Sequence, residues 1–401
     1  MTPVKPAATR ASSMPRSAIR EIMSLAAGRS DVIHLEVGEP DGQVDPEIIA
    51  GACDALRAGW TRYAPAGGLP ALREQIAARY TSRWSKKVSV EHTVVTTGAI
   101  GGLYAALMSV LDMGDEVLIP DPGWPNYESI CHLAGAQAVR YRLDPVSGYL
   151  PSIEEIERLT TDRTKAILIN TPGNPTGAVF PEPIMRAIAE HAAARGLYLI
   201  SDEIYEDMVF EGKHVSAAEY DIEDRLFVIS GVSKSYAMTG FRIGFLICPP
   251  ALASVAASLQ EPITSGAPSP SQKAAEAALS GDQSSVAALC NTFRRRCDVF
   301  IDAMGPEFVP VRPKGAFYTL VDISTTGMRS LDFCKLLLTK DAVATVPGIT
   351  FGPASDTTIR VAFSANEEAL VRAAALIRNR IAELAERNGA ARAASKVEAV
   401  K

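Results

Sequence analysis

A lysine in a turn of small residues is the most reactive candidate in this sequence. Lys234 lies in SGVSKSYAMTGFRIG, residues 230–244, directly after an expected strand. A primary amine in such a turn can form an imine with an aldehyde. Arg242 follows eight residues later and could hold a phosphate dianion bidentately, while Ser233 could add a hydroxyl donor. Taken alone, the segment is equally typical of a surface lysine in a loop.

Two further polar residues follow an expected parallel strand in YLISDEIYED, residues 198–207. Asp202 stands at the carboxyl end of this strand, and that end faces the ligand crevice of an open α/β sheet. A carboxylate there could pair with a protonated ring nitrogen and keep a cofactor ring electron-accepting. Tyr205 follows three residues later. In isolation, a solvated aspartate at a strand end is the simpler interpretation.

Two turns could bind anionic or polar ligand groups. Asn174 lies in the Pro/Gly-rich turn of INTPGNPTGAVF, where its amide could donate to a ring oxygen or a carboxylate, although a plain turn also explains the segment. In TVVTTGAIGGLYAAL, a strand leads through small residues into a helix, so Gly98, Ala99 and Ile100 would present backbone amides to a phosphate. The pattern is not GxGxxG, so it does not indicate a dinucleotide site.

In this order, the segments resemble the class I/II aminotransferases that depend on pyridoxal 5'-phosphate (PLP), the aspartate aminotransferase superfamily of fold type I. The glycine turn, an aromatic residue after a strand, NPTG, DEIY and SKSYAMTGFRIG follow one another as in that family. The resemblance extends from about Arg20 to about Phe363. It implies a ping-pong transfer of an amino group between an L-amino acid and a 2-oxo acid.

The resemblance also implies a role for each motif residue. Lys234 would hold PLP as a Schiff base and transfer protons, and Asp202 would pair with the pyridine nitrogen. Tyr205 and Asn174 would donate to the ring hydroxyl oxygen. The remaining cofactor contacts would come from the phosphate ligands Arg242, Ser233 and the amides of Gly98, Ala99 and Ile100, and from Trp124 of DPGWPNY, which would stack on the ring.

The family pattern places three more residues around the substrate and the subunit interface. Arg360, in TIRVAFS, would clamp the substrate α-carboxylate, and Gly38, in VGEPDG, would donate a backbone hydrogen bond to it. Trp124 and Asn174 would also contact the substrate. Tyr63, in RYAPAGGLPALRE, would reach the phosphate of a neighbouring subunit. The resemblance therefore implies a homodimer whose active sites are shared across the interface.

Some positions depart from common family versions. Gly231 stands where many members carry a phosphate-binding serine, Phe241 replaces a frequent tryptophan, and Gly42 replaces a common aromatic residue. The sequence shows no clear second basic residue for a side-chain carboxylate, although a partner subunit could supply one. A dedicated aspartate specificity is therefore not implied, and alanine, branched, aromatic and acidic amino acids all remain as substrates.

Two alternative functions share these motifs. A PLP-dependent lyase or synthase, such as a carbon–sulfur β-lyase or a cyclopropane-forming synthase, would reuse Lys234, Asp202 and Arg360. A non-catalytic PLP-binding regulatory protein would keep the same scaffold. The segment before Arg20 is too short for an added DNA-binding module, and the intact Lys234–Arg242 segment favours catalysis.

The elements that would position these residues alternate along the chain. From residue 70, short β-branched runs are separated by amphipathic helices, which predicts an α/β domain with a mainly parallel, doubly covered sheet. A helix-rich stretch over 251–304 precedes a smaller α+β pattern. The resemblance implies a seven-stranded sheet in the large domain, and a small domain formed by the N-terminal segment and the C-terminal part.

We therefore expect five segments in the chain. They are a flexible arm over 1–15, an N-terminal part of the small domain over 16–48, a large PLP-binding domain over 49–285, a C-terminal small domain over 286–383 and a loose tail over 384–401.

Composition limits the class of protein. With 47% hydrophobic residues the chain can bury a core, and a net charge of −6 gives no reason to expect nucleic acid or an anionic membrane as partner. The six cysteines and five histidines are scattered without CxxC or HExxH, so we expect no metal site and no disulfide framework. No apolar run approaches the roughly 18–20 residues of a membrane helix. The cytoplasm is the simplest compartment; the basic, acid-free first 20 residues leave a mitochondrial presequence as the alternative.

Overall fold

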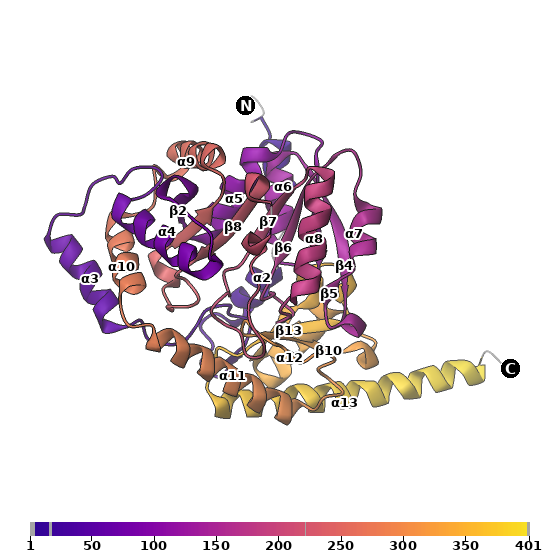
Figure 1. The fold of residues 1–401 in the computed structure, drawn as a ribbon. Helices are drawn as coiled ribbons and strands as arrows, with labels where there is room; N and C mark the ends of the chain where they lie inside the picture. The colour runs from indigo at the N-terminus through magenta and orange to yellow at the C-terminus, as the bar shows by residue number, and fades with distance from the viewer. Residues whose placement is uncertain (1–4, 16–17, 221, 399–401) are drawn as a thin grey trace.

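The computed structural model describes residues 5–15, 18–220 and 222–398. Its large sheet has eight strands in the order β2-β9-β8-β7-β6-β3-β4-β5 (Figure 1). The strands are β2 (Thr93–Thr97), β3 (Glu116–Asp121), β4 (Gln137–Asp144), β5 (Leu150–Pro151), β6 (Thr164–Asn170), β7 (Tyr198–Asp202), β8 (Leu226–Gly231) and β9 (Ile243–Ile247). Strands β4, β3, β6, β7 and β8 pair in parallel, whereas β9 is antiparallel to β8 and to β2. The expected mainly parallel sheet is confirmed, and the two-residue β5 adds an eighth strand to the expected seven.

Both faces of this sheet are buried. In β6, Ile167 and Ile169 belong to one hydrophobic core, and the alternating Ala166 and Leu168 belong to another. Successive side chains of a strand point to opposite faces, which is why these strands are apolar along their whole length. The covering helices are α4 (Pro70–Trp84), α7 (Ile153–Leu159), α8 (Glu182–Arg195) and α10 (Ser269–Ser280) on one face and α5 (Gly98–Val110), α6 (Asn126–Ala134) and α9 (Pro250–Thr264) on the other (Figure 1).

A second core joins the two ends of the chain. Strand β1 (Ile33–His34) pairs in parallel with β11 (Val343–Ala344), and β13 (Thr358–Ala362) lies between β10 (Tyr318–Asp322) and β12 (Val346–Pro347). Their core is shared by α2 (Ala18–Ala26), α11 (Ser284–Met304), α12 (Ser330–Asp341) and α13 (Glu367–Glu398). This arrangement is the expected combination of N-terminal and C-terminal segments, while the exact domain boundaries stay a prediction.

The remaining helices are short or peripheral. They are α1 (Thr9–Ser12), α3 (Pro46–Arg57) and the 3-10 helices η1 (Val90–His92), η2 (Pro145–Ser147), η3 (Ala217–Glu219), η4 (Glu223–Arg225), η5 (Thr239–Phe241), η6 (Ser324–Thr326), η7 (Gly348–Phe351) and η8 (Pro353–Ser355). Among the described residues, no helix combines the length and the apolarity that crossing a bilayer requires.

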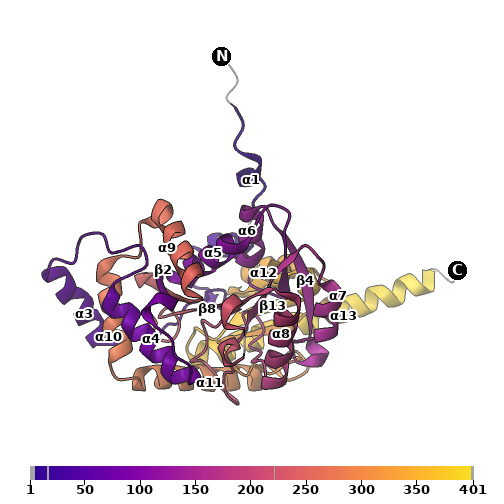
Figure 2. The same ribbon diagram turned by 45° about the horizontal axis from the view of Figure 1, so that its top comes forward.

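The N-terminal segment contacts the large domain through α1, whereas the C-terminal helix extends beyond the rest of the fold. Within the expected arm, Arg10 Nη1 of α1 donates to the carbonyl oxygen of Leu133 in α6 over 3.1 Å, and Figure 2 shows residues 5–8 running away from the fold. Residues 1–4 and 16–17 lie outside the described part. The expected loose tail over 384–401 is instead helical up to Glu398, as α13 continues beyond the body (Figure 1), because alanine and long charged residues are good helix formers. Residues 399–401 lie outside the described part.

Candidate active site

One cavity of about 450 Å³ opens where the carboxyl ends of β6, β7 and β8 meet the second core. Parallel strands end at the same edge of a sheet, which brings residues from distant motifs together. Eleven of the expected site residues line this cavity: Gly38, Ala99, Ile100, Trp124, Asn174, Asp202, Tyr205, Ser233, Lys234, Arg242 and Arg360. Gly98 and Tyr63 are the two expected residues that do not.

Lys234 lies in the turn after β8, with its amine inside the cavity. Its Nζ atom donates to the carbonyl oxygen of Gly38 over 2.5 Å and lies 5.8 Å from the ring centroid of Phe317. Burial lowers the pKa of the Lys234 amine to about 8, although the charge of Glu39 acts in the opposite direction. A fraction of this amine is therefore neutral near pH 7, as a proton acceptor or nucleophile must be.

Asp202 ends β7, and its carboxyl group is buried. Burial raises its pKa to about 6, against the hydrogen bond from Tyr127, whose hydroxyl donates to Oδ2 over 2.8 Å. The amide of Ile204 donates to Oδ1 over 3.3 Å. The side chain of Asn170 connects this strand end to the NPTG turn, since its Nδ2 donates to the Asp202 carbonyl and its Oδ1 accepts from the Asn174 amide. The two motifs are thereby held together.

Arg360 enters the cavity from β13 and is only 3% exposed. Its guanidinium carbon lies 4.5 Å from the ring centroid of Tyr318 and 5.3 Å from that of Phe351. Nη2 donates to the carbonyl oxygen of Glu36 over 2.6 Å and Nη1 to Oδ1 of Asn174 over 3.4 Å, whereas the buried Nε has no partner among the described residues. Burial lowers the pKa of this arginine. A buried guanidinium with an unused donor fits a carboxylate ligand.

The phosphate-binding candidates meet at the start of α5. Arg242 adopts a left-handed backbone conformation with φ of 57°, and its Nη1 donates to the carbonyl oxygen of Thr239. Its guanidinium lies so close to Gly98 that a Cβ atom at that position would be 2.6 Å from Nη2. Contrary to expectation, the Gly98 amide donates to the Arg242 carbonyl oxygen over 2.9 Å and is not free for a phosphate. Ala99 and Ile100, the next residues of the helix N-terminus, line the cavity.

Sequence reasoning missed several residues of the cavity wall. Tyr318 contributes a hydroxyl that lies 3.0 Å from that of Tyr205. Its motif, GAFYTLV, indicates only a strand, so its polar end gives no signal. Other missed lining residues are Ile19, Met23, Glu36, Val37, Glu39, Asn126, Tyr127, Asn170, Ile204 and Thr239. Tyr63 is 91% exposed on this chain, so its expected role depends on a partner subunit.

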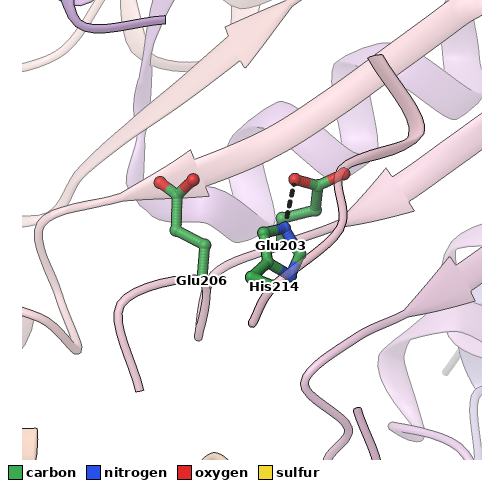
Figure 3. Close-up of side chains that lie close together, drawn as sticks. All are labelled: Glu203, Glu206 and His214. Carbon is green, nitrogen blue, oxygen red and sulfur yellow. Dashed lines mark hydrogen bonds and ion pairs between the residues drawn. The ribbon is translucent and has the colours of Figure 1, made fainter. Parts of the chain in front are cut away.

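Glu203, Glu206 and His214 form a compact group (Figure 3), and Glu203 directly follows Asp202 in the chain. Their potential metal-ligand atoms lie within 4.8 Å of one another. However, Glu203 pairs with His214 over 2.7 Å and accepts from Ser201 and Ser216, while Glu206 accepts from Tyr80 and Ser230 and pairs with Arg83. Because protein donors engage these oxygens, we assign the group a structural role in holding the turn that carries Tyr205.

Known proteins share both the sequence and the fold of this chain. The family model for aminotransferase class I and II matches residues 30–377. The arginine–pyruvate transaminase of Pseudomonas aeruginosa is 36% identical, with 85% of this chain and 87% of that protein covered. The aspartate/prephenate aminotransferase of Thermus thermophilus is 35% identical, with 86% and 89% covered.

A solved structure extends the match to three dimensions. The aspartate aminotransferase from Thermus thermophilus with maleate has a TM-score of 0.90 at 33% identity, covering 94% of this chain and 100% of that chain. These findings confirm the family, the fold class and the type of enzyme that the motifs indicated. The chain belongs to the class I and II aminotransferases, a PLP-dependent family, and is an aminotransferase.

Proposed function

We propose that this aminotransferase binds PLP in the cavity and links it to Lys234. The observation that carries the proposal is the convergence of a part-buried amine with a pKa of about 8, a buried carboxylate and a buried arginine in one cavity. Perturbed titratable groups that face one another in a cleft are typical of active sites. Each of the three matches one functional group of a PLP-dependent reaction.

The donors around the cavity fit the cofactor chemically. Arg242, Ser233 and the start of α5 at Ala99 and Ile100 suit a phosphate, and the close approach of Arg242 to Gly98 leaves no room for a Cβ atom there. Asp202 would face the ring nitrogen. Tyr205 and Asn174 would face the ring hydroxyl, and Trp124 the face of the ring.

The residues of this chain would then carry out amino transfer. When bound, PLP supplies an aldehyde that links to amines and a ring that accepts the electron pair released at the substrate Cα. Arg360 and the Gly38 segment would bind the substrate α-carboxylate and orient the Cα–H bond. Neutral Nζ of Lys234 would accept the Cα proton and, in the same half-reaction, donate it to the former aldehyde carbon of the cofactor. Ionised Asp202 would keep a proton on the ring nitrogen.

We infer an L-amino acid as donor and a 2-oxo acid as acceptor. The side chain of the donor is not specified by these contacts, because they involve groups common to all amino acids. We further propose a homodimer in which the exposed Tyr63 reaches the partner's phosphate site, and a cytoplasmic location.

Borohydride reduction tests the cofactor link directly. Full-length protein with PLP is reduced, digested and examined by mass spectrometry. The phosphopyridoxyl mass should appear on the peptide that contains Lys234 and should be absent after Lys234→Ala. Lys340→Ala, at an exposed position of α12, is the matched control and should label normally. Labelling of another lysine in the wild-type protein would refute the assignment.

A further inference from the structure

We propose that Tyr127 is a positioning residue for the reaction, holding both Asp202 and Trp124 in the arrangement that the cofactor ring requires. The inference rests on the proposed function, in which Asp202 faces the ring nitrogen and Trp124 the ring face. Tyr127 belongs to the first turn of α6 and ends the DPGWPNY motif, in which only Trp124 was expected to have a role.

The side chain of Tyr127 touches both groups from one buried position. It is 1% exposed, and its hydroxyl donates to Oδ2 of Asp202 over 2.8 Å. Its ring meets that of Trp124 edge-on, with centroids 5.7 Å apart and planes at 82°. Edge-to-face aromatic pairs have a preferred geometry, so this contact orients the indole as well as covering it. One residue thereby connects the end of β7 with the loop before α6.

The hydrogen bond also fixes the orientation of the carboxylate. The other oxygen, Oδ1, accepts from the Ile204 amide over the longer distance of 3.3 Å. No other residue in the described part of the chain donates to Oδ2. Rotation about the terminal torsion of an aspartate is soft. Without the tyrosine hydroxyl, Oδ2 would be buried without a donor and the carboxylate would be free to turn.

The hydrogen bond from Tyr127 also lowers the pKa of Asp202 relative to what burial alone would give. Burial raises the pKa of Asp202, and the hydrogen bond from Tyr127 opposes that rise. Of the charged groups facing Asp202, Glu203 raises its pKa and Lys234 lowers it, while the Tyr205 hydroxyl lies nearby on the following turn. Burial also raises the pKa of Tyr127 well above its ordinary value, so the phenol stays a donor at all physiological pH values. Tyr127 therefore favours an ionised Asp202.

Tyr127→Phe removes this hydroxyl and keeps the ring beside Trp124. Tyr141→Phe is the matched control, because Tyr141 is also buried and donates to a backbone carbonyl, that of Leu168, outside the cavity. PLP affinity of the cofactor-free full chain is measured by fluorescence titration from pH 5 to pH 9, and thermal unfolding reports on folding. For the wild type, affinity should fall as pH drops through the Asp202 pKa of about 6.

In Tyr127→Phe, the decrease in PLP affinity at low pH should occur about one pH unit higher than in the wild type, as expected for the loss of a charge-assisted hydrogen bond. At pH 8 kcat should drop more than KM changes, since the substrate contacts are untouched. Tyr127→Leu, the second variant, also removes the ring edge and should show the same pH shift with weaker affinity at every pH. In Tyr141→Phe the profile should match the wild type.

Superimposable profiles for Tyr127→Phe and the wild type would overturn the proposal, as would an equal shift in Tyr141→Phe. Asp202→Asn separates this failure from that of the proposed function. If Asp202→Asn kept both the affinity and the pH dependence of the wild type, Asp202 would not be the ring partner, and the proposed function itself would lose that residue. If Asp202→Asn abolished the pH dependence while Tyr127→Phe left it unchanged, only the role of Tyr127 would be refuted.

Discussion

The Nζ atom of Lys234 donates a hydrogen bond to the carbonyl oxygen of Gly38, with 2.5 Å between the two atoms. Lys234 follows β8 of the large sheet, whereas Gly38 follows β1 beside the second core. Two residues before Gly38, the carbonyl oxygen of Glu36 accepts from Arg360. The amine and the guanidinium thus converge on one short segment, as a site for the adjacent amino and carboxylate groups of an amino acid requires.

The part-buried amine of Lys234 should lower the stability of the cofactor-free protein. Its folded-state pKa of about 8 lies below the ordinary value of 10.5, so the unfolded chain binds the extra proton between these pH values and stability rises with pH there. Below pH 8 the full cost, about 3 kcal/mol, applies. Lys234→Met, of similar volume, should therefore raise the free energy of unfolding most at pH 7 and progressively less toward pH 10.5. Urea unfolding at pH 7 and pH 10 measures this, and an equal gain at both pH values would contradict it.

Arg360→Gln should weaken amino-acid binding more than it slows turnover. The side chain contributes charge-assisted hydrogen bonds of about 1.5–3 kcal/mol, so KM for the donor should rise about 10- to 100-fold. Arg312→Gln is the control, because Arg312 is half-exposed and pairs with Asp298 outside the cavity. Steady-state kinetics with varied donor gives the result, and an unchanged KM would remove Arg360 from the carboxylate site.

Gly98→Ala should weaken PLP binding through the displacement of Arg242. Gly98 has φ of 71°, and an added Cβ would meet the Arg242 guanidinium at 2.6 Å. Gly148→Ala is matched in backbone strain, with φ of 72°, and has no atom within 4 Å of the added Cβ. Both variants should lose about 1–2 kcal/mol of stability from the left-handed backbone. Only Gly98→Ala should also lose PLP affinity, at least about tenfold by fluorescence titration; equal affinities in the two variants would refute the contact.

Tyr63 should act across a subunit interface. Lys234→Ala and Tyr63→Ala are each expected to be nearly inactive. Mixing the two after mild dissociation should restore up to about a quarter of wild-type activity, since half of the dimers are hybrids and each hybrid has one intact site. Light scattering verifies the dimer. Absence of recovery in a mixture that has exchanged subunits would place Tyr63 outside the partner's site.

The sequence predicts those parts of the molecule that have a local signature. Short β-branched runs separated by amphipathic helices identified the sheet. Turns rich in glycine, proline and serine identified the positions of Asn174 and Lys234. Arg360 could be found only through the family pattern, because an arginine in a strand is usually exposed. Its burial depends on Tyr318 and Phe351, which come from distant parts of the chain.

Contacts formed by tertiary packing were not predictable in the same way. Tyr127 lies in NYESICHLA, where its spacing is that of an ordinary core residue, and only the approach of α6 to β7 gives its hydroxyl a function. Of the three amides expected to be free at the start of α5, that of Gly98 is not, because its pairing with Arg242 is a non-local hydrogen bond. The tail was expected to be loose although its composition favours a helix.

We propose that Lys234 carries out amino transfer rather than elimination. We would incubate the PLP-loaded enzyme with ¹⁵N-labelled amino acid and an unlabelled 2-oxo acid, and follow the label by mass spectrometry. The wild type should move ¹⁵N into the amino acid formed from the oxo acid. In Lys234→Ala this transfer should fall by about 10²–10⁴-fold, as is typical for the loss of a general base. Release of the label as ammonia by the wild type, or transfer undiminished in Lys234→Ala, would contradict the account.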